Sequence, residues 1–226
     1  MRKLLFHFVF AVIVAGDLVG EWYQYPMFEF VFKPLIMVWI AAYFLYYAKG
    51  IDQKVIQWAM FAFLFSWIGD VLLIAGNTKF LFFILGLLSF FVAQVFYMNL
   101  FLRTINLSGK KPFLKKSPYW LIAYIAYGLI FYILLFNHLD ATLKIAVFIY
   151  MVALLGMSVM ALSRFGNGHP VSFTLVFSGS VLFVLSDTMI AINKFLAPVP
   201  FEGVLIMATY IGAQYLIMTG LLKQYE

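Results

Sequence analysis

The sequence contains no cysteine and few charged residues. Asp, Glu, Lys and Arg make up only 11% of its 226 residues, whereas 65% are hydrophobic. The absence of cysteine excludes disulfide bonds and thiolate metal sites. A soluble domain carries about 25% charged and about 45–50% apolar residues, and no water-soluble fold of this size can hide so much apolar surface. The composition therefore predicts an integral membrane protein, and the length suits one polytopic membrane domain over residues 1–226.

Apolar runs of spanning length recur along the chain. Each approaches the ~20 residues that a helix needs to cross a hydrocarbon layer of ~30 Å. The runs do not alternate as the strands of a membrane barrel do, so the sequence predicts an all-α bundle of eight transmembrane helices. The runs are 4–20, 28–47, 55–75, 80–102, 119–136, 141–162, 171–193 and 201–222. The first run follows Arg2 and Lys3, so it can also be read as a signal peptide, which would leave seven spans.

The net charge of +6 comes mainly from bases in the connections between these runs. This pattern is typical of membrane topology and of contact with anionic lipid headgroups, not of nucleic-acid binding. One side of the bundle would hold most of the bases, including those of the 108–118 loop, and the other side only Lys79, Lys144 and Lys194. We therefore expect both termini in the cytoplasm, and the plasma (inner) membrane as the location if the protein is bacterial.

Two segments of the chain resemble each other. Gly69 to Leu73 (Gly-Asp-Val-Leu-Leu) aligns with Ser186 to Ile190 (Ser-Asp-Thr-Met-Ile). In the helix after each segment, Ala-Gln recurs at Gln94 and Gln214. Because four predicted helices separate the copies, both would run in the same direction. The pattern is consistent with two parallel four-helix repeats about an axis along the membrane normal.

Four charged residues fall inside the apolar runs, at a cost of about 2.5–3.5 kcal/mol each. From the helical rise, Asp70 and Asp187 lie roughly 22 and 24 Å from the cytoplasmic face, and Lys33 roughly 9 Å below the opposite face. Asp17 falls in the same layer. One interpretation is an ion-pair cluster in which Lys33 neutralises an aspartate. The other is a functional site, because intramembrane ionisable residues usually mark one.

Three aspartates against one lysine favour the functional interpretation. At least one carboxyl group would lack a full partner and keep a proton near neutral pH. We expect Asp70 and Asp187 to lie close enough to share one proton, and together they would form an acid–base pair. Pro34 is expected to break the second helix near this site. The histidines His7, His138 and His169 have no metal-ligand spacing, so neither a metal nor a cofactor is predicted.

Several motifs resemble the YhhN family of membrane proteins over nearly the whole chain. They are Lys33-Pro34, the segment Ser66 to Leu73, the segment Gly86 to Tyr97, Tyr150, the segments Phe183 to Asp187 and Asn193 to Phe195, and Tyr210 with Gln214. The resemblance implies eight helices and, as in the lysoplasmalogenases of the family, hydrolysis of the vinyl ether bond of a lysophospholipid. The products would be a fatty aldehyde and a glycerophospho-base.

The resemblance also implies roles for individual residues. Asp70 and Asp187 would be the catalytic acid and base, without an assignment of which is which. The family pattern Ala-His-x-x-Tyr has Gln94 in place of His here, so no acid–base role is expected there. Substrate would be bound by Lys33, Gln94, Tyr97, Tyr150, Asn193, Tyr210 and Gln214. Hydrogen bonding between helices is the other role open to Gln94 and Gln214. A proton-coupled transporter of small molecules or lipids is the alternative function.

Overall fold

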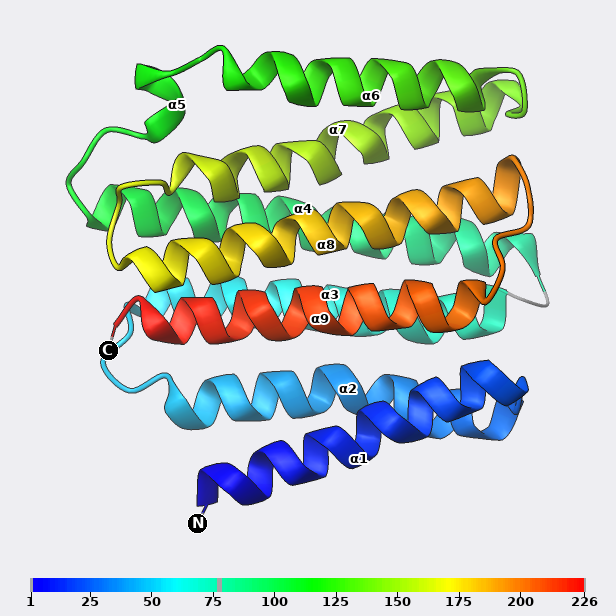
Figure 1. Cartoon of the computed structure of the whole chain (residues 1–226), viewed down its shortest axis with the longest axis horizontal. Coiled ribbons are helices and arrows are strands. Elements are labelled where there is room, and N and C mark those ends of the chain that lie inside the picture. The colour runs from blue at the N-terminus through cyan, green and yellow to red at the C-terminus, as the bar shows by residue number, and fades with distance from the viewer. Residues whose placement is uncertain (1, 77–78, 226) are drawn as a thin grey trace.

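This computed structural model describes residues 2–76 and 79–225, and every regular element in these ranges is an α-helix (Figure 1). The side chains of Arg2 and Lys3 lie outside the described part. The helices are α1 (Arg2–Tyr23), α2 (Pro26–Tyr47), α3 (Gln53–Gly76), α4 (Phe80–Leu107), α5 (Phe113–Lys116), α6 (Trp120–Phe136), α7 (Ala141–Ser163), α8 (Pro170–Phe195) and α9 (Glu202–Lys223).

The apolar runs of the sequence correspond to these helices. Within the described ranges, seven helices are long and apolar enough to cross a membrane, and the equally apolar α6 has 17 residues. At 1.5 Å per residue α6 covers about 26 Å, slightly less than a typical hydrocarbon layer. The predicted all-α membrane bundle is confirmed, and the protein is a multi-pass integral membrane protein. The short helix α5, within the 108–118 loop, was not predicted.

The helices pack in a pattern that is similar in the two halves of the chain. α3 pairs with α4, and α8 pairs with α9, at the centre of the bundle. α2 packs on both α3 and α9, whereas α7 packs on both α8 and α4. α1 and α6 lie on the outside, against α2 and α7 respectively, and α1 also contacts α9. Apart from this α1–α9 contact, exchanging α2–α4 with α7–α9 leaves the pattern in place, which is the arrangement expected of two parallel repeats.

Close approach of helix backbones holds the α8–α9 pair together. A Cβ atom on Gly179 would lie 2.8 Å from the carbonyl oxygen of Ala213, and one on Gly220 would lie 2.9 Å from the backbone nitrogen of Val176. Ser186 donates a hydrogen bond of 3.1 Å from its Oγ to the carbonyl oxygen of Ile206. Small residues at such crossings let membrane helices pack without intervening side chains.

Both chain ends lie at the same end of the bundle (Figure 1). Asp52 accepts hydrogen bonds from Arg103 at this end, 2.8 Å from Nη2 and 3.1 Å from Nε. These bonds hold the pKa of Asp52 below its ordinary value. Lys79, Lys144 and Lys194 lie at the opposite end.

Arg164 directly follows α7, in the loop before α8, but its side chain is buried. Its guanidinium donates hydrogen bonds to Thr104 (3.1 Å), Ser172 (2.9 Å) and Gln224 (3.3 Å). The end of α7 is thereby joined to α4, α8 and the segment that follows α9. Arg164 therefore belongs to the packing of the bundle as well as to its charge pattern.

The prediction that Pro34 breaks the second helix is wrong. α2 continues through Pro34 from Pro26 to Tyr47. A proline inside a helix removes one backbone hydrogen bond, and membrane helices tolerate this when neighbouring groups compensate.

Candidate active site

The four intramembrane charges lie in one layer of the bundle. Asp17, Lys33, Asp70 and Asp187 are each about two helical turns from the end of the bundle opposite the chain termini. They come from α1, α2, α3 and α8, so the layer forms only when the helices pack. Asp70 lies within electrostatic range of the other three.

Asp187 faces a narrow apolar cavity between α4, α7 and α8. Tyr150, on α7, donates a hydrogen bond of 2.5 Å from its hydroxyl to Asp187 Oδ2. The two side chains line the cavity together with apolar residues of α3, α4, α7 and α8. The cavity volume is about 50 Å³, well below the ~300–1,000 Å³ of typical ligand pockets. A ligand larger than a few waters would need the helices to move apart.

Asp70 lies in a buried hydrogen-bond network between α3, α4 and α9. Tyr210 donates 2.8 Å from its hydroxyl to Asp70 Oδ2. Gln214 Nε2 donates to the Tyr210 hydroxyl at 3.3 Å and to Ser66 Oγ at 3.1 Å, while Tyr97 donates to Gln214 Oε1. All five side chains are buried. Tyr97, Tyr210 and Gln214 therefore fix Asp70 within the bundle, and among the described residues none of the three lines the Asp187 cavity.

Ser66 also belongs to this network, although the sequence did not predict a role for its side chain. It precedes Asp70 by four residues on α3, so the two side chains share one helix face. That spacing is the signal that could have identified it.

The two carboxyl groups are held by different tyrosines. In the part of the chain that the structure describes, no hydrogen bond joins Asp70 to Asp187, and each accepts a hydrogen bond from its own tyrosine. Because the tyrosines come from α7 and α9, the aspartates occupy separate polar sites within electrostatic range of each other. The catalytic roles of both aspartates stay a prediction.

The two sites have similar composition. Gln94, on α4, lies beside the Tyr150 hydroxyl, as Gln214 lies beside Tyr210. The side-chain nitrogen and oxygen of Gln94 have no hydrogen-bond partner among the described residues. Each aspartate thus lies near a tyrosine and near a glutamine that comes from the other half of the chain. The resulting groups are Asp70–Tyr210–Gln214 and Asp187–Tyr150–Gln94.

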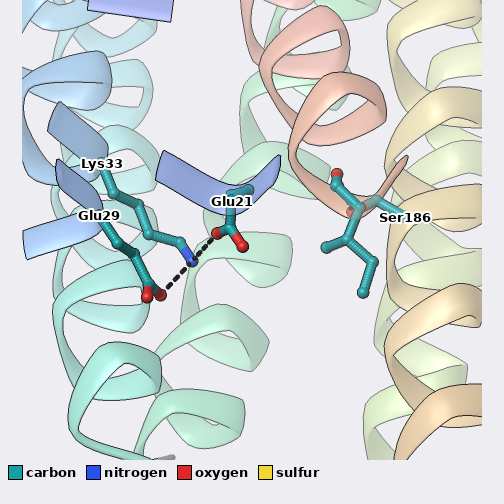
Figure 2. A network of polar contacts seen from close by, with 5 residues as sticks. Glu21, Glu29, Lys33 and Ser186 are labelled. Atoms are coloured by element: carbon teal, nitrogen blue, oxygen red, sulfur yellow. Dashed lines mark hydrogen bonds and ion pairs between the residues drawn. The ribbon is translucent and has the colours of Figure 1, made fainter. Parts of the chain in front are cut away.

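Lys33 pairs with glutamates and not with an aspartate. Figure 2 shows its ammonium between Glu21, at 3.3 Å, and Glu29, at 3.1 Å. The interpretation in which Lys33 neutralises an aspartate by direct contact is therefore wrong. Glu29 is four residues before Lys33 on α2, a spacing that favours ion pairs and that could have revealed it. The contact with Glu21 depends on how α1 packs against α2.

A second, polar cavity of about 360 Å³ adjoins the apolar one. Both cavities are lined by Leu73, Phe83 and Ile190, so they share a wall. Asn193 lines the polar cavity, and its Oδ1 accepts a hydrogen bond of 3.0 Å from the backbone of Val199 in the α8–α9 loop. The charged lining residues are Glu21, Glu29, Lys33, Lys194 and Glu202.

Asp17 does not line this cavity; it is fully buried and lies within electrostatic range of Lys33, Glu21 and Glu29. Its carboxylate oxygens have no hydrogen-bond partner among the described residues. The same part of the chain contains no group of three or more Asp, Glu, His or Cys side chains that could hold a metal ion.

Comparison with known proteins identifies the family. The family model of YhhN matches residues 28–221. The chain belongs to the YhhN family. Among its YhhN-like relatives, lysoplasmalogenase TMEM86A of Homo sapiens is 31% identical over 165 residues, which is 72% of this chain and 64% of the relative. Lysoplasmalogenase TMEM86A of Bos taurus is 32% identical over 164 residues, again 72% and 64%.

Lysoplasmalogenase TMEM86B of Sus scrofa is 33% identical over 156 residues, which is 69% of this chain and 59% of the relative. The chain thus matches less than two thirds of the length of these curated relatives. No solved structure matches it.

In this YhhN chain, the Asp187 carboxyl group lies in the wall of an apolar cavity that adjoins a polar one. Tyr150 holds one carboxyl oxygen of Asp187, so the other oxygen can face the apolar cavity. A proton donor in an apolar environment acts on nearby groups without competition from bulk water. The adjoining polar cavity offers charges of both signs to a headgroup.

Proposed function

We propose that the protein is a membrane hydrolase that cleaves the vinyl ether bond of lysoplasmalogens to a fatty aldehyde and a glycerophospho-base. The names of its relatives support this substrate class. The observation that carries the proposal is the Asp187 carboxyl group, held by Tyr150 in the wall of an apolar cavity that adjoins a charged one. A single-chain lipid has the same division into an apolar chain and a charged headgroup.

The proposed chemistry begins with Asp187 as a general acid. Its proton moves to the vinyl carbon that is not bonded to oxygen, which leaves an oxocarbenium ion at the other carbon. Water then adds to that carbon while the Asp187 carboxylate accepts the proton released by the water. The hemiacetal collapses to the aldehyde and the free hydroxyl of the glycerophospho-base. One carboxyl group acting first as acid and then as base has a precedent in glycoside hydrolysis.

Asp70 would act as the second carboxylate, through its charge. Asp70 lies within electrostatic range of Asp187, but it is not one of the described residues that line the Asp187 cavity. A carboxylate fixed by Tyr210 would stabilise the positive oxocarbenium ion, and fixed charges act strongly in a site of low dielectric constant. Lys33, which the sequence predicts to bind substrate, would instead hold Glu21 and Glu29 in the polar cavity.

The proposal also places the site in the membrane. With both termini in the cytoplasm, the polar cavity opens near the opposite face, where headgroups of that leaflet lie. The lipid chain would enter sideways between helices, because the Asp187 cavity is closed to a chain at about 50 Å³. The membrane would be the plasma (inner) membrane if the protein is bacterial.

The test incubates purified protein in detergent with a lysoplasmalogen and with its saturated alkyl-ether analogue. Carbon protonation requires the double bond, so we expect aldehyde from the vinyl ether alone. Equal turnover of both lipids would overturn the mechanism. Absence of turnover would overturn the proposed hydrolase function and favour the alternative of a proton-coupled transporter, which releases no aldehyde.

A further inference from the structure

The polar cavity has an unusual balance of charges. Lys33 is shared between Glu21 and Glu29, so this group of three carries a net negative charge. Glu202, in the first turn of α9, adds a carboxylate that forms no salt bridge among the described residues. The other cation of the cavity is Lys194, whose Nζ lies 5.1 Å from the centre of the Phe83 ring. The cavity is therefore slightly acidic, with one lysine that remains available to an anion.

The carboxylates of the cavity have fixed positions. Glu21 packs against the backbone of Gly203, where a Cβ atom would overlap its carboxylate. Trp22 stacks on Phe201 with ring centres 5.0 Å apart, which holds the end of α1 against the start of α9. The buried Asp17 adds a further acidic group within electrostatic range of Glu21 and Glu29. Acidic groups held in this way favour a cation.

The chemistry of the cavity favours one kind of cation. Carboxylates accept hydrogen bonds, so a primary ammonium group with three N–H donors can satisfy them. A trimethylammonium group has no donor and is usually bound by a cage of aromatic rings. Among the residues that line this cavity, Phe83 is the aromatic one, and Lys194 lies over its ring.

The cavity is positioned to hold the headgroup of a lipid whose reacting bond lies at Asp187. Lys194 follows Asp187 by seven residues on α8, so both lie on one face of the helix, about 10 Å apart along its axis. Ile190, between them, lines both cavities. A phosphate at Lys194 would therefore place the ammonium among the glutamates and the glycerol beside the shared wall.

We propose that the polar cavity is a headgroup site selective for phosphoethanolamine, in which Glu202, Glu21 and Glu29 bind the primary ammonium and Lys194 binds the phosphate. The proposal rests on the proposed function, since it assigns the substrate of that same site. Headgroups with a net negative charge are disfavoured by the acidic balance of the cavity.

The experiment measures binding without turnover. Purified full-length protein in detergent is titrated with saturated 1-O-alkyl lysophospholipids, which lack the vinyl ether bond. Their headgroups are phosphoethanolamine, its N-methyl and N,N-dimethyl derivatives, phosphocholine and phosphoglycerol. We expect Kd to rise with each methyl group, by about tenfold in all, because charge-assisted hydrogen bonds are lost. Equal affinity for ethanolamine and choline headgroups would overturn the proposal.

Variants locate the preference within the cavity. Glu202→Gln should reduce the ethanolamine-to-choline ratio of affinities, whereas Lys194→Gln should weaken both lipids similarly. Lys79→Gln is the matched control, because Lys79 lies at the same end of the bundle outside the cavity. An unchanged ratio in Glu202→Gln would contradict the assignment. If the preference for ethanolamine is found but no aldehyde is ever released from lysoplasmalogen, the headgroup site stands and the proposed hydrolase function fails. If aldehyde is released but no preference is found, only the headgroup site is overturned.

Discussion

The Tyr150 hydroxyl donates a hydrogen bond of 2.5 Å to Asp187 Oδ2, in the wall of the apolar cavity. This contact determines which carboxyl oxygen is available to a substrate, and it stabilises the carboxylate that remains after proton transfer. Tyr150→Phe should therefore lower kcat by roughly 10- to 100-fold with little change in KM, the range of a hydrogen bond to a charged group.

Steady-state kinetics on lysoplasmalogen test this prediction. Tyr127→Phe is the control, because the Tyr127 hydroxyl is 2.6 Å from Oγ1 of Thr188, the neighbour of Asp187, but Tyr127 does not line the Asp187 cavity. We expect near wild-type rates from it. A rise in KM with unchanged kcat in Tyr150→Phe would assign that tyrosine to substrate binding instead.

Tyr210 is expected to contribute mainly to stability. Tyr210→Phe removes the donor to Asp70 and one contact of Gln214, leaving buried polar groups unsatisfied. The expected loss is about 1–3 kcal/mol. Thermal unfolding in detergent should show a clear decrease, whereas Tyr119→Phe, with a tyrosine 62% exposed, should leave the midpoint unchanged. Similar midpoints for the two variants would argue against the Asp70 network.

The apolar helices (seven of spanning length and the shorter α6 among the described residues) and the layer of intramembrane charges could be predicted from the sequence, because apolar run length and helical rise are local properties. The partners of those charges could not. Tyr210 is 140 residues from Asp70, and whether they meet depends on the rotation of α9 against α3. Lys33 illustrates both cases: its pair with Glu29 follows from helical spacing, while its pair with Glu21 requires the packing of α1 on α2.

The α8–α9 contact gives a prediction about packing. Gly179→Ala would place a Cβ atom 2.8 Å from a backbone oxygen of α9, which cannot move aside as a side chain can. Overpacking of this kind typically costs about 1–3 kcal/mol. At Gly212 the nearest atom to an added Cβ is a leucine methyl group at 3.3 Å. Gly212→Ala should therefore unfold close to the wild-type temperature, and equal losses in both variants would contradict this packing.

Arg164 should matter more to stability than its position next to a loop suggests. Arg164→Met removes the hydrogen bonds that join the end of α7 to Thr104 on α4, Ser172 on α8 and Gln224 after α9. Because bonds to charged groups contribute about 1.5–3 kcal/mol each, we expect a loss of at least about 2 kcal/mol. Arg103→Met is the comparison, since its pair with Asp52 is partly exposed to solvent and such pairs contribute less than a buried network. Unfolding midpoints that rank the two variants in the opposite order would refute the role assigned to Arg164.

The rate of aldehyde release by Asp187→Asn is the measurement that tests the central claim most directly. An amide keeps the shape of the carboxyl group but cannot deliver the proton to carbon. The rate should fall by about 10²- to 10⁴-fold relative to wild type, while affinity for the saturated alkyl-ether lysolipid stays within a few fold. In D₂O, the wild-type product should carry one deuterium on the carbon next to the aldehyde. Release at the wild-type rate by Asp187→Asn would contradict the account.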